Sequence, residues 1–371
     1  MPATDLSRRG FLTTAAALTL ASGTTEAMAD QPAPASRLER ALCLSGGGAR
    51  GAYEAGVIDY LRSSKQLSDG SALSPYGIVT GTSIGAINGY FVATAQYSLL
   101  RDLWYQIADQ NVFVLKRRYA KAANPDSGIG TRFAAALRMV VSLAKNDTGV
   151  IDGSRLRSWL SEYIDPNKTP VMPFVWPVTN LTTQSPEFFF IVGSALSQAT
   201  RERAAAAVRA TVGPSAVLRE ATPDILLDAL IASTAIPVAF DPIALPSPNG
   251  KSTNLYVDGG VTANTPIGVA RAAAANVDVI MVDPPFHSAT YANAFEIGLG
   301  VFGAMQRRIL ESDLRAAYLE SNRQSNFYVL HPNEDLEVSV IGFDDGVKLY
   351  ASYKAGYADA AHGFQPYVFE T

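Results

Sequence analysis

A serine flanked by glycines is the feature of this sequence that points most directly to chemistry. Residues 81–85 read G-T-S-I-G, which fits the pattern G-x-S-x-G. The segment Tyr76–Thr80 predicts a short buried strand, and Ala86–Ala93 predicts the first turns of a buried helix. On such a strand-to-helix turn the Ser83 hydroxyl is exposed and can act as a nucleophile. The pattern also arises by chance, so other residues have to support it.

A glycine run near the N-terminal end offers donors for a developing oxyanion. Residues 45–51 read S-G-G-G-A-R-G and follow a predicted strand at Arg40–Leu44. Free backbone N–H groups at Gly46, Gly47 and Gly48, at the positive end of the next helix, suit that purpose. The run fits neither nucleotide-binding glycine pattern, which leaves a plain tight turn as the alternative. We expect Arg50 to hold this loop by bonding nearby carbonyl groups.

The base that would activate the serine has two candidate types. The chain has three histidines, His287, His331 and His362, and either of the last two could complete a serine–acid–histidine triad. The other candidate is Asp258, in the sequence Y-V-D-G-G at residues 256–260. An aspartate at the carboxyl end of an apolar strand lies where open α/β sheets bind ligands, although aspartate before glycine also caps ordinary turns.

Predicted strands and helices alternate along most of the chain, which favours an α/β fold with a mostly parallel sheet covered by helices. The formal net charge of -4 gives no electrostatic case for nucleic acid as a partner. No apolar run reaches the roughly 18 residues needed to span a bilayer. The single cysteine, Cys43, lies in an apolar strand and is interpreted as a buried core thiol.

The first 29 residues have the pattern of a twin-arginine export signal. Residues 7–12 read S-R-R-G-F-L, an apolar stretch follows, and residues 27–29 read A-M-A, a small-x-small cleavage pattern. We therefore expect a signal peptide at 1–29, a polar linker at 30–39, and a periplasmic or secreted mature protein.

Two further regions depart from the alternating pattern. Residues 98–149 read as an insertion or lid, with a basic turn at 116–121 and an apolar helix at Phe133–Ala144. That basic turn is either an ordinary solvated turn or a membrane contact. Residues 286–371 predict a mainly helical extension packed on the same domain, which itself spans 40–285.

Three motifs in order resemble the patatin-like phospholipase family: the glycine run, the serine motif, and Asp258 with the two glycines after it. The A-S-T-A-I-P segment at 232–237, with Asn264 and Pro266 after the third motif, supports the resemblance. The residues matching the motifs besides the reactive ones are Arg50, Gly51, Gly81, Gly85, Gly259 and Gly260. At Gly260 many members of the family have alanine.

The resemblance implies a three-layer α/β/α fold and a Ser–Asp dyad that needs no histidine, metal or cofactor. Ser83 would be the nucleophile, Asp258 the base, and the amides of Gly46–Gly48 the oxyanion hole. It implies hydrolysis of phospholipids or other lipid esters, with peripheral membrane contact as an expectation. The alternatives are a general carboxylesterase or thioesterase with the same dyad, and a lipid-binding protein without turnover.

Overall fold

The computed structural model describes residues 38–64, 76–119, 148–193, 197–212, 217–263, 265–283, 294–320 and 326–367. The predicted signal peptide and the predicted helix at Phe133–Ala144 lie outside these residues, so both stay predictions. The histidine His287 and the motif residue Asn264 also lie outside them.

The described elements alternate between strands and helices along the chain. The strands are β1 (Leu38–Leu44), β2 (Ile78–Gly81), β3 (Val114–Leu115), β4 (Ile151–Asp152), β5 (Phe174–Asn180), β6 (Ser185–Ile191), β7 (Val217–Glu220), β8 (Ile243–Pro246), β9 (Thr253–Val257), β10 (Ala274–Ile280), β11 (Asn326–Leu330) and β12 (Gln365–Pro366). The helices are η1 (Gly48–Arg50), α1 (Gly51–Ser64), α2 (Ile84–Ala93), α3 (Tyr97–Gln106), η2 (Ile107–Gln110), α6 (Ser154–Tyr163), α7 (Gln198–Val212), α8 (Leu226–Thr234), η3 (Gly259–Val261), α9 (Ile267–Ala273), α10 (Ala294–Glu320) and α11 (Gly346–Ala360).

The central sheet is mostly parallel, as the alternation predicted. Its order is β12-β11-β10-β1-β2-β5-β6-β7, and the run from β11 to β5 pairs in parallel throughout. Antiparallel pairs occur where β12 meets β11, where β5 meets β6, and in the β5–β9–β8 branch. The first strand therefore lies in the middle of the sheet, between β10 and β2.

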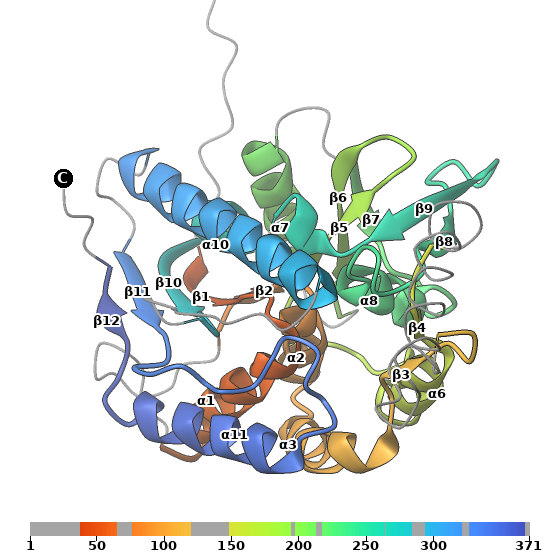
Figure 1. The fold of residues 1–371 in the computed structure, drawn as a ribbon. Helices are drawn as coiled ribbons and strands as arrows, with labels where there is room; N and C mark the ends of the chain where they lie inside the picture. The colour runs from red at the N-terminus through yellow and green to blue at the C-terminus, as the bar shows by residue number, and fades with distance from the viewer. Residues whose placement is uncertain are drawn as a thin grey trace, which may run out of the picture. The chain divides into compact units, whose positions relative to one another are not determined.

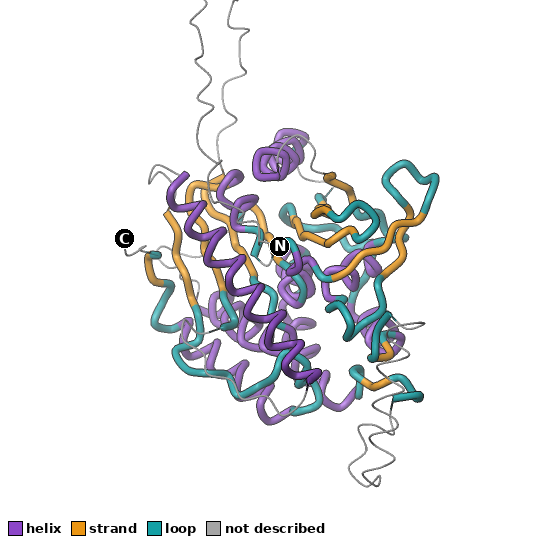
Figure 2. The backbone as a smooth tube through the Cα atoms, turned by 45° about the horizontal axis from the view of Figure 1, so that its top comes forward, coloured by secondary structure: helices purple, strands orange, loops and turns teal. Residues whose placement is uncertain are grey.

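Helices cover both faces of this sheet, and alternate residues of β1 point into two separate cores. Leu42 and Leu44 pack with α1 and α2, whereas Ala41 and Cys43 pack with α9 and α10. Figures 1 and 2 show α10 on one side of the strands and α1, α2 and α11 on the other. The fold is thus a three-layer α/β/α arrangement, and both faces of β1 are apolar because both are buried.

The region after residue 286 does more than add helices. Strand β11 pairs with β10 in parallel and extends the central sheet, and α11 packs on α1. Among the described residues, no helix is long and apolar enough to cross a membrane.

Candidate active site

Ser83 occupies a sharp, strained turn between β2 and α2. Its backbone has φ 54° and ψ -123°, a conformation that residues other than glycine rarely adopt. A Cβ on Gly81 would collide with the carbonyl oxygen of Gly85, and one on Gly85 would lie 2.6 Å from the carbonyl oxygen of Ser45. The two motif glycines are therefore required by close backbone approach.

Asp258 lies directly against this serine. The Ser83 hydroxyl donates to Asp258 Oδ2 at 2.7 Å, and both side chains are almost fully buried. The other carboxylate oxygen, Oδ1, accepts from the Gly260 amide at 2.7 Å. A third contact fixes the backbone, because the Thr179 hydroxyl donates to the Asp258 carbonyl at 2.9 Å. The sequence placed these two groups 175 residues apart, and the fold joins them.

Burial raises the pKa of Asp258 to about 7, and the hydrogen bonds from Ser83 and Gly260 only partly offset this effect. A carboxyl group with that pKa can exist in both protonation states near neutral pH. This is the property that a group needs if it accepts a proton in one step and returns it in the next.

The glycine run lies beside Ser83, and a distant segment holds it in place. Gly48 has φ +60°, and a Cβ there would collide with the Val340 carbonyl group. The Ala49 amide donates to that same carbonyl at 2.9 Å. Within the described part of the chain, the amides of Gly46, Gly47 and Gly48 make no backbone hydrogen bond, so they remain available as donors.

Arg50 holds this loop through two contacts. Its Nε donates to the Val338 carbonyl at 3.1 Å, and its Nη1 forms an ion pair with Asp283. The Val338 carbonyl is thus close to Arg50 in space, although 288 residues separate the two in the sequence. Gly51, next along the chain, faces Ile84 and Trp104 so closely that a Cβ would lie 2.5 Å from the isoleucine side chain.

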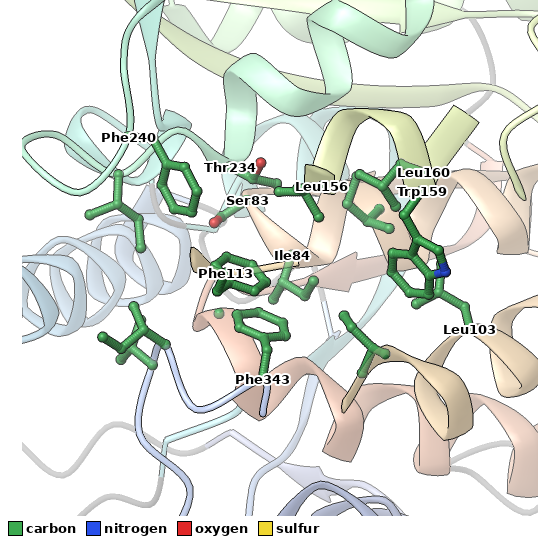
Figure 3. A pocket seen from close by; sticks show the side chains of 16 residues that line it. Ser83, Ile84, Leu103, Phe113, Leu156, Trp159, Leu160, Thr234, Phe240 and Phe343 are labelled. Carbon is green, nitrogen blue, oxygen red and sulfur yellow. The ribbon is translucent and has the colours of Figure 1, made fainter. Parts of the chain in front are cut away.

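An apolar pocket begins at Ser83. It encloses about 510 Å³ of empty space, including the part open to solvent. Figure 3 shows Ser83 and Phe240 toward one end and Trp159 and Leu103 at the other. The lining residues are Gly48, Ser83, Ile84, Ile87, Leu103, Ile107, Phe113, Leu156, Trp159, Leu160, Thr234, Ile236, Phe240, Val340, Ile341 and Phe343. Such a lining favours a hydrocarbon chain over a polar ligand.

Comparison with known sequences now adds a finding to this geometry. The sequence model described as patatin-like phospholipase matches residues 42–271, more than half of the chain. The chain belongs to this family. Membership supports lipid acyl hydrolysis in general terms. A search of curated proteins finds no match.

Among solved structures, the chain is similar to VipD from Legionella pneumophila. The two share 14% identity with a TM-score of 0.36, and the match covers 88% of this chain and 66% of that one. The chain thus matches slightly less than two thirds of that protein's length.

The histidines that the triad alternative requires are placed elsewhere. His331 makes a 3.0 Å contact with the Pro332 carbonyl through Nδ1. Neither His331 nor His362 lines the pocket of this patatin-like chain, and Asp258 occupies the position beside the Ser83 hydroxyl. Over the described ranges there is no cluster of three or more histidine, cysteine, aspartate or glutamate side chains that could hold a metal ion.

The serine motif did not predict the groups that hold the backbone of the Ser83 turn. The Ser83 amide donates to Ser233 Oγ at 3.0 Å, and that hydroxyl donates to the Pro177 carbonyl at 2.8 Å. Ser233 belongs to the A-S-T-A-I-P segment that carried part of the family resemblance. The available signal was a serine in that motif, near the end of the mostly apolar α8, but the sequence did not show its partner.

A second buried carboxyl group lies near the site without entering the pocket. Glu54 Oε2 accepts from Asn88 Nδ2 at 2.9 Å, and the same nitrogen donates to the Gly51 carbonyl at 3.0 Å. Trp104 Nε1 donates to Asn88 Oδ1 at 2.9 Å. Asn88 therefore links the helix after the glycine loop, the helix after Ser83, and α3. Burial raises the pKa of Glu54 to about 8.

Proposed function

We propose that this protein hydrolyses lipid esters through a Ser83–Asp258 dyad. The observation that carries the proposal is the 2.7 Å hydrogen bond from a strained, pocket-lining serine to a buried carboxylate. Proximity of a nucleophile to its base, with free amides alongside, is the arrangement that acyl transfer requires.

The reaction follows from these positions in two steps. In the first, Ser83 Oγ attacks the ester carbonyl carbon while its proton moves to Asp258 Oδ2. The resulting oxyanion accepts hydrogen bonds from the amides of Gly46, Gly47 and Gly48. The bond to the alcohol then breaks, and the alcohol leaves with the proton from Asp258.

In the second step a water molecule attacks the acyl-serine and gives its proton to Asp258. Collapse of this second intermediate releases the carboxylic acid, and the proton returns to Ser83 Oγ. The net reaction consumes one water and one ester. Each step uses Asp258 once as base and once as acid, which suits its pKa of about 7.

The pocket supports an acyl chain as the part of the substrate that is bound. Apart from Ser83 and Thr234, the side chains lining it are apolar or aromatic. We infer that phospholipids or lysophospholipids are the substrates, with the scissile carbonyl at Ser83 and the chain directed toward Trp159. A soluble ester with a short chain fits the same site with less apolar contact, which makes a general carboxylesterase the second candidate.

The decisive experiment compares hydrolysis by the mature protein and by Ser83→Ala, using a soluble ester and a panel of lipids with products identified by mass spectrometry. We expect the substitution to abolish turnover on both substrate types, since it removes the hydroxyl group that is proposed to form the acyl intermediate. His331→Ala and His362→Ala are the matched controls and should retain the wild-type rate. Equal rates in Ser83→Ala and wild type would contradict the proposal, and activity on soluble esters alone would favour the carboxylesterase.

A further inference from the structure

Helix α10 presents apolar side chains outward rather than toward the protein. Ile297, Val301 and Met305 are 51%, 55% and 53% exposed. A spacing of four residues places all three on one face of a helix. Isolated exposed apolar residues are ordinary, but three in line on one surface helix require an explanation.

The face of α10 opposite this row packs next to the proposed catalytic residues. Gln306 is buried, and a Cβ on Gly260 would collide with its Nε2. Gly260 is the residue whose amide bonds to Asp258. Phe302, one turn earlier, packs against the core that contains the pocket walls. In Figure 3 the pale blue helix, in the colour of α10, lies beside the Phe240 end of the pocket.

Arginine side chains follow the apolar row along the outward face of the helix. Arg308 follows Met305 by three residues, its side chain is 82% exposed, and it pairs with Glu311 at 3.1 Å. Arg315 and then Leu319 continue the same face at helical spacing, and both are exposed. Exposed apolar side chains can insert at the boundary of a lipid surface, and a neighbouring arginine can attract anionic head groups.

We propose that this outward face of α10 (Ile297, Val301 and Met305, followed by Arg308) binds the surface of a lipid aggregate. The inference rests on the proposed function, because it explains how a pocket for one acyl chain is held against assembled lipid. A second copy of the chain fits less well. A stable dimer buries about 800 Å² on each partner, more than three half-exposed side chains provide.

The test separates binding to lipid from the chemistry. The variant Ile297→Gln/Val301→Gln/Met305→Gln is compared with wild type for sedimentation with phosphatidylcholine vesicles, both proteins carrying Ser83→Ala to prevent turnover. Loss of three partly inserted side chains should weaken vesicle binding roughly 30- to 100-fold. With Ser83 intact, the same triple variant should hydrolyse a soluble short-chain ester at the wild-type rate.

The control is Val171→Gln, which alters a single apolar residue of similar exposure (54%). The Val171 amide donates to the carbonyl of Ala93, which is the last residue of α2, whereas Ser83 precedes the first residue of that helix. This variant should bind vesicles as wild type does. A second arm, Arg308→Gln, should weaken binding about fivefold on vesicles that also contain phosphatidylglycerol, and less on phosphatidylcholine alone.

Three results would overturn the proposal. They are unchanged vesicle binding by the triple variant, an equal loss in Val171→Gln, and a wild-type dimer in light scattering that the triple variant converts to monomer. If wild type binds vesicles through α10 yet hydrolyses no ester, the proposed function fails while the lipid-binding surface stands. The two failures are therefore distinguishable.

Discussion

Asp258 and Glu54 are both fully buried carboxyl groups close to α2, and they differ in what their carboxyl oxygens contact. Asp258 contacts a hydroxyl group in a strained turn that lines a pocket. Glu54 contacts the amide of Asn88, about one turn into the same helix, and does not line the pocket that begins at Ser83. Burial raises the pKa of both.

The comparison shows that a raised pKa does not by itself indicate a catalyst. Desolvation acts on any buried carboxyl group, whether or not a substrate can reach it. What distinguishes Asp258 is its partner, since a hydroxyl can lose its proton to a carboxylate and an amide cannot. We therefore assign Glu54 to the support of three helices and propose proton transfer for Asp258 alone.

The largest expected difference comes from making the same chemical change at both positions. Asp258→Asn removes the base and should lower kcat/KM on a soluble ester roughly 10²- to 10⁴-fold. Glu54→Gln keeps an acceptor for Asn88 and should change kcat/KM by no more than about threefold. Steady-state rates and circular dichroism of both variants provide the measurement. If both variants fold and lose kcat/KM to a similar extent, Asp258 and Glu54 could not be given different roles.

The pH profile should sharpen the contrast further. Asp258 must be ionised to accept the serine proton, and its pKa is raised to about 7, so kcat/KM should rise with pH through about 7. The profile is measured on a soluble ester from about pH 5 to about pH 9. In Glu54→Gln the midpoint of this rise should stay in place. If the midpoint of the pH profile shifts in Glu54→Gln, the titrating group would be Glu54 and not Asp258.

The smallest effect concerns stability. The pKa of Glu54 is raised from 4.5 to about 8, so the native state binds more protons than the unfolded state between these values. The free energy of unfolding therefore falls as pH rises through that window, by up to about 1.4 kcal/mol per pH unit for this group. Glu54→Gln should lose this slope, as urea unfolding at several pH values would show. Parallel stability curves for wild type and variant would mean that Glu54 titrates normally.

Local patterns were sufficient to predict the parts of the site that are made by turns. The close contact that requires Gly81 is with the Gly85 carbonyl, four residues later in the same turn, and such a contact leaves a local signature. The contacts that require Gly85 and Gly259 are with distant carbonyl groups, so for these two only the motif spacing was visible in the sequence. The fold class could be predicted for the same reason, because alternating buried strands and helices are read from short windows.

The sequence could not predict contacts between distant segments. Nothing near Ala49 indicates that its amide bonds to Val340, and nothing in Asn326–Leu330 fixes its place beside β10. Glu54 reads as an ordinary acidic residue in the first turn of a helix, which stabilises the helix dipole. Its partner Asn88 becomes visible only when two helices are placed side by side.

The hold that Val340 and Val338 exert on the glycine loop has a consequence for synthesis of the protein. The loop is made early, but the carbonyl groups that bond to Ala49 and Arg50 are added almost 300 residues later. A nascent chain that already contains Ser83 and Asp258 still lacks the support for its proposed oxyanion donors. Translation must pass Val340 before the glycine loop can be held as the structure shows, so we expect a ribosome-bound chain to lack the proposed hydrolase activity.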